Sequence, residues 1–212
     1  MFGTSLKLDY AKPLGTLTSI TAYDHFNELL TGDQFNFLPI QESVLFNFFG
    51  ADQAQHQFLD VNAVSEALQF ASPATKRVRW IAGAYLIGTD RFISTGNVFD
   101  LGTGEVPEVR RDPLPLFNPQ FTFLADSQDN FAWAAFGNVD VNLTDKLELS
   151  TALRYDRDHR KNTTETPAEF IPAPLVGIAF PGQVRTHTWD DLQPKVTLRH
   201  KPTQDSTLYV GY

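Results

Sequence analysis

The chain has 212 residues, 42% of them hydrophobic and 13% aromatic, with a formal net charge of −8 and no cysteine. A chain without cysteine has no disulfides, thiolate metal sites or cysteine nucleophiles, and an acidic balance argues against nucleic acid as a partner. No stretch approaches the roughly 18 consecutive apolar residues of a membrane helix, which excludes a helical membrane protein.

The N-terminal part of the chain predicts two strands. Over residues 5–11 apolar side chains alternate with polar ones, which is the pattern of a half-buried strand. A turn with proline and glycine follows at 12–15. The segment 16–28 is rich in strand-forming residues, but its pattern does not separate the two faces.

A long connection is predicted next, from 29 to 63. It contains a phenylalanine-rich patch at 44–50 among Gln, Asp and Asn residues, and a weak helical spacing over 51–59. A structureless loop of this length is unusual inside a compact soluble domain.

A second strand pair is predicted at 64–72 and 77–89, joined by a short turn. The pattern of 77–89 also leaves its two faces undetermined. The following connection, 90–126, contains many prolines and glycines, so we expect no long regular element there.

The clearest element is a long β-hairpin from Asp129 to His159 with a short polar turn at 142–145. In both strands one face is apolar and the other becomes polar, with a period of two. The apolar faces carry Phe131, Trp133, Ala135, Gly137, Val139 and Val141, and then Leu147, Leu149, Thr151, Leu153 and Tyr155. Aromatic residues lie at the end far from the turn, as in strand pairs that cross a bilayer.

The chain closes with a long connection at 161–185, a strand at 186–200, a turn at 201–206 and a strand at 207–212. Pro194 lies within a predicted strand, which in a soluble sheet places that strand at an edge. Short and long connections therefore alternate along the whole chain. Transmembrane barrels have this alternation, with short periplasmic turns and long extracellular loops.

The two ends predict a fragment. The first residues, MFGTSLKLDYA, lack the charged and apolar regions of a signal peptide, and the last residues, TLYVGY, end within a strand-like run. We therefore predict an all-β fold, an antiparallel transmembrane β-barrel segment of about eight strands.

Several stretches resemble the β-barrel of TonB-dependent outer-membrane receptors of the iron-siderophore type: LKLDYAKPLGTLTSITAY, SEALQFASP, RWIAGAYLI, FAWAAFGNVDVNLTDKLELSTALRYDRDHRK and WDDLQPKVTLRHKPTQDSTLYVGY. The resemblance covers most predicted strands but not the long loops. It implies that residues 1–212 form part of a 22-stranded barrel whose plug domain and closing strands are absent. It also implies a place in the cell outer membrane and energy-coupled uptake of a scarce nutrient such as a ferric siderophore. The partners it implies are outer-membrane lipid, the ligand, and periplasmic TonB through the missing plug segment.

No residue pattern predicts an enzyme, a cofactor or a metal site. The histidines are scattered without metal-ligand spacing: His25, His56, His159, His187 and His200. The adjacent Asp190 and Asp191 point to opposite faces of a strand and cannot act as a carboxylate pair. Charged residues of the alternating strands are instead expected to line the barrel interior: Lys7, Asp9, Asp140, Glu148, Arg154 and Asp156.

One ligand-contact site is predicted, in the phenylalanine-rich extracellular loop at Phe46, Phe48 and Phe49. Exposed aromatics at a barrel mouth stack on a ligand, or else pack the loop against its neighbours. Two other functions remain open from the residues. One is a complete small outer-membrane barrel with a structural or adhesive role, and the other is a soluble all-β carbohydrate-binding module.

Overall fold

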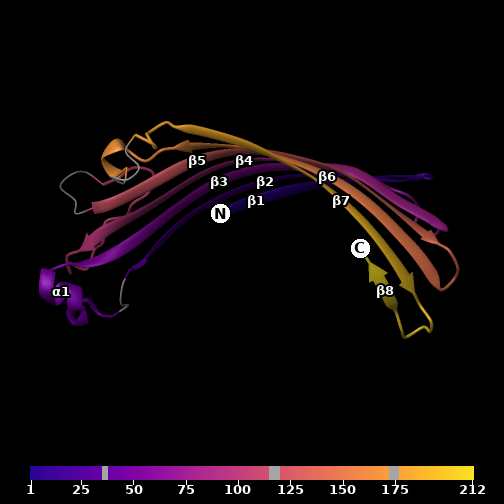
Figure 1. The fold of residues 1–212 in the computed structure, drawn as a ribbon, viewed down its shortest axis with the longest axis horizontal. Coiled ribbons are helices and arrows are strands. Elements are labelled where there is room, and N and C mark those ends of the chain that lie inside the picture. Colours follow the sequence, from indigo (N-terminus) through magenta and orange to yellow (C-terminus); the bar gives the residue numbers. More distant parts are fainter. Residues whose placement is uncertain (35–37, 115–119, 172–176) are drawn as a thin grey trace.

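The computed structural model describes residues 1–34, 38–114, 120–171 and 177–212. It contains one eight-stranded antiparallel sheet in which every strand pairs with its neighbours in the chain (Figure 1). The strands are β1 (Phe2–Lys12), β2 (Gly15–Asp33), β3 (Asp52–Ala71), β4 (Val78–Asp100), β5 (Gln120–Asn142), β6 (Leu147–Thr164), β7 (Val184–His200) and β8 (Leu208–Gly211). The helical elements are η1 (Ile40–Glu42), α1 (Val44–Phe49) and η2 (Ala168–Phe170).

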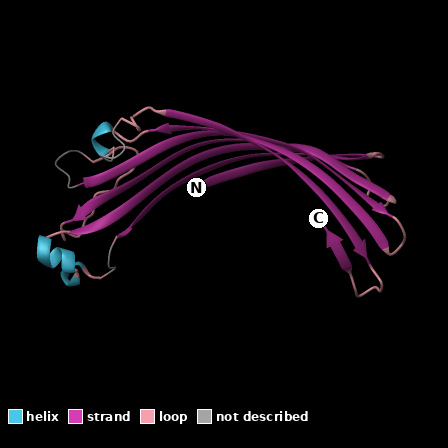
Figure 2. Cartoon of the chain, viewed as in Figure 1, coloured by secondary structure: helices cyan, strands magenta, loops and turns pink. Residues whose placement is uncertain are grey.

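The sheet is long, arched and open, with β1 and β8 at its opposite edges (Figure 2). The four short turns lie at one end of the strands, and the three long connections, with α1 and η2, lie at the other (Figure 1). The predicted all-β fold of about eight strands is confirmed. No helix among the described residues is long and apolar enough to cross a membrane.

The strands extend further toward the long connections than the sequence predicts. Residues 51–59, expected to have helical spacing, instead begin β3, and the only α-helix of the described chain is α1. The expectation of no long regular element over 90–126 is also wrong, because β4 continues to Asp100 and β5 begins at Gln120. On these strand ends the covered face carries small or polar residues such as Ala54, His56 and Ser94, so the sequence lacks the alternation of large apolar with polar residues that marks a half-buried strand.

The register of the seven strand pairs assigns every strand residue to one of two faces. We call them the apolar face and the polar face. The large side chains of the apolar face include Leu6, Leu8, Tyr10, Leu17, Leu68, Phe70, Trp80, Leu86, Phe131, Trp133, Val139, Leu153, Leu192, Val196 and Leu198, and all of them except Phe70 and Trp133 are exposed. The register also resolves segments 16–28 and 77–89, whose faces the sequence left open.

The buried core lies at the loop end of the sheet, on the side of the apolar face. Phe58, Phe92 and Phe123 project from β3, β4 and β5 and are almost fully buried, together with Val109 of the connection 101–119. The guanidinium of Arg111 lies 4.7 Å from the centre of the Phe92 ring. The described parts of the long connections thus fold back over the strand ends.

Pro194 costs the sheet no hydrogen bond to β6. The neighbouring Val196 exchanges two backbone hydrogen bonds with Tyr212, each 2.9 Å long, on the β8 side. Backbone groups two residues apart in an antiparallel strand point the same way, so the Pro194 nitrogen also faces the β8 side. It lies beyond the paired part of β8, where no N–H is required.

Candidate functional site: the two faces of the sheet

The apolar face carries a band between two rows of aromatic side chains. Near the short turns Phe70 and Trp80 pack with ring centres 5.3 Å apart, and nearer the long connections Trp133 and Tyr155 pack at 5.4 Å. Following β4 from Trp80, the first charged residue on this face is Asp90, ten positions along. That length matches the roughly 9–11 tilted residues with which a strand spans the hydrocarbon of a bilayer.

One polar cluster interrupts the band on β2 and β3. The Glu66 carboxylate accepts hydrogen bonds from the hydroxyls of Ser19, at 2.6 Å, and Thr21, at 2.5 Å. Its neighbours across the sheet on this face include Leu86 of β4. A charged group on such a face is unfavourable in lipid, and the two hydroxyls supply the hydrogen bonds that lipid cannot.

The polar face carries the charged residues that the sequence assigns to one side. Near the short turns Glu148 lies between Arg79 and Arg199, with 2.8 Å between a guanidinium nitrogen of Arg199 and a Glu148 oxygen. Further along, Arg154 and Asp156 form an ion pair at 2.6 Å. Lys7, Asp9 and Asp140 lie on the same face. The six residues that the sequence assigns to the barrel interior thus lie on one face of the sheet.

Near the long connections the polar face holds a group of four side chains that we call the Trp189 wall: Asp158, Arg160, His187 and Trp189. The Arg160 guanidinium lies 5.2 Å from the centre of the Trp189 ring, and the His187 ring packs on Trp189 with centres 4.3 Å apart. Asp158 accepts hydrogen bonds from Arg160 at 2.7 and 2.9 Å. Half of the Trp189 surface remains exposed.

Unpaired polar atoms lie beside this wall. The second carboxylate oxygen of Asp158, the amide oxygen of Asn130 and the Nε atom of Arg91 are buried without a hydrogen-bond partner. Asn130 stands opposite Arg160, which in turn stands opposite His187. Buried polar groups are normally paired, so these three atoms are exceptions among the described residues.

The three phenylalanines of the predicted loop site differ in their exposure to solvent. Phe48 and Phe49 of α1 are each 80% exposed, whereas Phe46 is partly buried and packs near Gly102. The adjacent residues Leu38 and Ile40 line a cavity of about 260 Å³ over β3, on the side of the apolar face. The Phe-rich segment therefore lies on the other side of the sheet from the Trp189 wall.

His56 lies in that cavity, in the part of β3 beyond the apolar band. The side chain is buried, and neither ring nitrogen has a hydrogen-bond partner. Burial lowers the pKa of His56, with a smaller opposing effect from the negative charge of Glu108. Burial of the His56 side chain under the connection therefore favours the neutral form of its imidazole.

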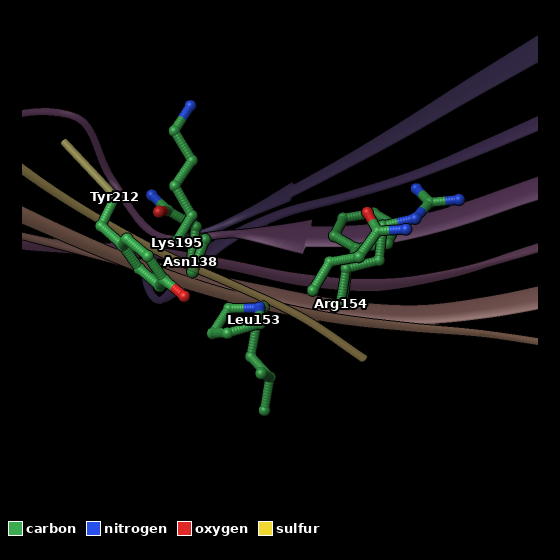
Figure 3. Close-up of a pocket in the computed structure, with 10 residues that line it drawn as sticks. Asn138, Leu153, Arg154, Lys195 and Tyr212 are labelled. Carbon is green, nitrogen blue, oxygen red and sulfur yellow. The ribbon is translucent and has the colours of Figure 1, made fainter. Parts of the chain in front are cut away.

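An open groove of about 530 Å³ lies along the free side of β7 (Figure 3). In it Leu153 points away from Lys195 and Asn138, as expected for residues on opposite faces of one sheet. The groove lies where β7 has no paired neighbour. It is a strand edge and not an enclosed ligand site.

The comparisons with known proteins agree with this geometry. The family model described as TonB dependent receptor-like, beta-barrel, matches residues 1–212. The chain belongs to this family. No curated protein sequence matches it significantly.

Solved structures of two uptake receptors and a metal transporter share the fold. The chain superposes on the ferric yersiniabactin uptake receptor FyuA from Yersinia pestis with a TM-score of 0.71 at 13% identity, covering 99% of this chain and 27% of FyuA. For the siderophore receptor PiuA from Acinetobacter baumannii the TM-score is 0.65 at 12% identity, over 99% and 31% of the two chains. The copper transporter OprC gives 0.60 at 16%, over 99% and 28%. The chain thus spans less than a third of each of these proteins.

The sequence of this receptor barrel segment predicts its polar face, but it does not predict the Trp189 wall. Arg160 and Trp189 are far apart in the chain and meet only through the register of β6 with β7. The separation of Asp190 and Asp191 onto opposite faces is confirmed. No group of three or more potential metal ligands occurs among the described residues.

Proposed function

We propose that this chain forms about eight strands of a larger receptor barrel in the outer membrane, and that the receptor takes up a ferric siderophore by energy-coupled transport. The family match, the open sheet and the two faces support this proposal. In it the apolar band faces lipid, the polar face lines the interior, and the short turns lie on the periplasmic side. The plug and the closing strands would come from parts of the receptor outside residues 1–212.

The single observation that carries the ligand proposal is the Trp189 wall. Its exposed indole offers a surface for stacking, and the Arg160 guanidinium and the His187 ring beside it offer hydrogen-bond donors. An anionic ligand with aromatic or planar groups, such as a ferric catecholate siderophore, matches both features. The described parts of the long connections pack on the opposite side of the sheet and leave this wall uncovered.

The test is uptake by cells that express the full-length receptor as their only siderophore receptor. Radioactive iron is supplied as a ferric tris-catecholate, a ferric hydroxamate or ferric citrate. We expect uptake of the catecholate to fall at least ten-fold in Trp189→Ala and Arg160→Gln, and to be largely kept in Trp189→Phe. Lys195→Gln, on the polar face nearer the turns, is the matched control.

Equal uptake by Trp189→Ala and the unmodified receptor, at equal amounts of receptor in the outer membrane, would refute the role of the wall. Phe46, Phe48 and Phe49 remain the proposed loop contact. Phe48→Ala and Phe49→Ala alter exposed side chains only, so a loss of uptake in them would assign ligand contact to the loop and not to packing.

A complete eight-stranded barrel with a structural role receives less support, because β1 and β8 are not paired with each other. A soluble carbohydrate-binding module is disfavoured by the many large apolar side chains exposed on one face.

A further inference from the structure

Positive charge is concentrated at the short-turn end of this acidic chain. Each of the four short turns carries one lysine: Lys12, Lys76, Lys146 and Lys201, and Arg77 follows Lys76. The acidic residues in these turns are Asp145 and Asp205. The long connections have the opposite balance, with Glu42, Glu105, Glu108, Asp112, Glu165 and Glu169 against Arg110 and Arg111.

The turn cations have no acidic partners. All five are exposed, and none forms an ion pair with a carboxylate among the described residues. Some basic residues on the strands do form such pairs, for example Lys7 with Asp9 and Arg160 with Asp158, whereas Arg91, Arg157, Arg185 and Lys195 do not. The positive charge at the turns is therefore not neutralised within the described chain.

Hydrogen bonds join three of the four turns into a continuous rim. Arg77 donates to the backbone carbonyls of Asn142 and Leu143, at 2.9 and 3.3 Å, in the next short turn. Lys146 donates through Nζ to the carbonyl of Pro202 in the turn after that, at 3.1 Å. These contacts hold the side chains of Arg77 and Lys146 against the neighbouring turns.

The rim adjoins the apolar band. The Lys12 ammonium lies 4.7 Å from the centre of the Tyr10 ring, which is on the apolar face in line with Phe70 and Trp80. Aromatic rings at such a boundary occupy the headgroup region of a bilayer, and lysines beside them reach the level of the lipid phosphates. The cations thus stand where a membrane presents phosphate groups.

We propose that the rim formed by Lys12, Lys76, Arg77, Lys146 and Lys201 binds the headgroups of anionic phospholipids in the leaflet on the short-turn side. The ligand class is a phosphodiester lipid with a net negative charge, such as a phosphatidylglycerol. The lipid is favoured over an acidic protein because the cations are spread over four turns along one edge of an apolar band. The inference rests on the proposed membrane orientation.

The test is native mass spectrometry of the full-length receptor in detergent with equal amounts of dioleoyl-phosphatidylglycerol and dioleoyl-phosphatidylcholine. The acyl chains are identical, so binding to the apolar face contributes equally to both. A lysine near an anionic surface contributes enough to change binding roughly five-fold. We expect the unmodified receptor to bind the glycerol lipid at least about five-fold more than the choline lipid.

The variant with Lys12, Lys76, Lys146 and Lys201 all changed to Gln is expected to lose this preference, and the variant with all four changed to Arg to keep it. The control changes the three remaining lysines, Lys7, Lys161 and Lys195, to Gln and is expected to keep the preference. Heat-modifiable migration on gels verifies that each barrel is folded. The ratio of phosphatidylglycerol to phosphatidylcholine bound by the unmodified receptor tests the proposal even where a variant does not fold.

Equal binding of the two lipids by the unmodified receptor, or an unchanged preference in the Gln variant, would overturn the proposal. Two soluble probes identify other occupants. Glycerol phosphate binding as tightly as the lipid would assign the rim to free phosphates, and polyglutamate binding in place of the lipid would assign it to an acidic protein. A receptor that keeps the lipid preference but fails to take up siderophore would refute only the proposed ligand.

Discussion

A single arginine placed on each face of the sheet should have very different effects on stability. Leu153 lies midway along the apolar band of β6, between Gly137 and Pro194, and half of its surface is exposed. Gln193 lies at the same depth on the polar face of β7, where it donates to Asp191 at 3.1 Å. The two substitutions Leu153→Arg and Gln193→Arg introduce the same charge on opposite faces of the sheet.

The expected costs follow from the surroundings of the two positions. An arginine facing lipid near the middle of a bilayer costs about 2–4 kcal/mol, and loss of the half-buried leucine adds roughly 1 kcal/mol. Leu153→Arg should therefore shift the unfolding equilibrium roughly 10²- to 10⁴-fold. Gln193→Arg stays in water and retains Asp191 as a partner, so its effect should remain within about 1 kcal/mol.

The assay is denaturant unfolding of the full-length receptor reconstituted in phosphatidylcholine vesicles, followed by tryptophan fluorescence and gel mobility. Loss of stability in Leu153→Arg but not in Gln193→Arg is the expected result. Equal destabilisation by both substitutions, or a larger effect of Gln193→Arg, would refute the assignment of the apolar face to lipid.

Three further outcomes are expected. Glu66→Gln removes a charge from the apolar band, and its carbonyl oxygen accepts from one of the Ser19 and Thr21 hydroxyls while its amide N–H donates to the other. Stability in vesicles should therefore rise by up to about 2 kcal/mol. A marked loss in the same unfolding assay would contradict this. His56 is buried with a lowered pKa, so the unfolded or open state takes up a proton first and loop closure should weaken as pH falls below about 6.5. Limited proteolysis of the connection 101–119 should therefore accelerate at acidic pH in the unmodified receptor but not in His56→Phe. Gly15 has a φ of 151°, and an added Cβ would lie 2.2 Å from the Ala71 carbonyl oxygen. Gly15→Ala should therefore lower the free energy of unfolding by about 1–3 kcal/mol in the same assay. Gly32→Ala is the control, because a Cβ added there has no other atom within 4 Å.

The sequence predicts the fold best where the bilayer imposes one polar and one apolar face. In the hairpin of β5 and β6 the alternation from Phe131 to Val141 sets the strand period, the faces and the turn, and all three appear in the structure. Beyond the band this constraint ends. In this part of β3 Gln53, Gln55 and Gln57 form one face, but the covered face begins with Asp52, Ala54 and His56 and carries no large apolar side chain before Phe58, so the sequence does not predict a strand there.

The candidate site depends on pairings that the sequence does not contain. Arg160 and Trp189 meet because β6 and β7 pair in one register, and a shift by a single residue would place them on opposite faces. The lysine in each short turn, by contrast, is visible in the sequence once the turns are located. Only the structure shows that these turn lysines have no carboxylate partners within the described chain.

The most direct test of the central claim is a scan of nitroxide spin labels along β5 from residue 131 to 141 in the full-length receptor in lipid vesicles. Collisions with oxygen report exposure to lipid, and collisions with a water-soluble nickel chelate report exposure to the aqueous interior. We predict that oxygen accessibility peaks at 131, 133, 135, 137, 139 and 141 and that nickel accessibility peaks at the positions between them. Accessibilities without a period of two, or with the two phases exchanged, would contradict a barrel wall with lipid on the apolar face.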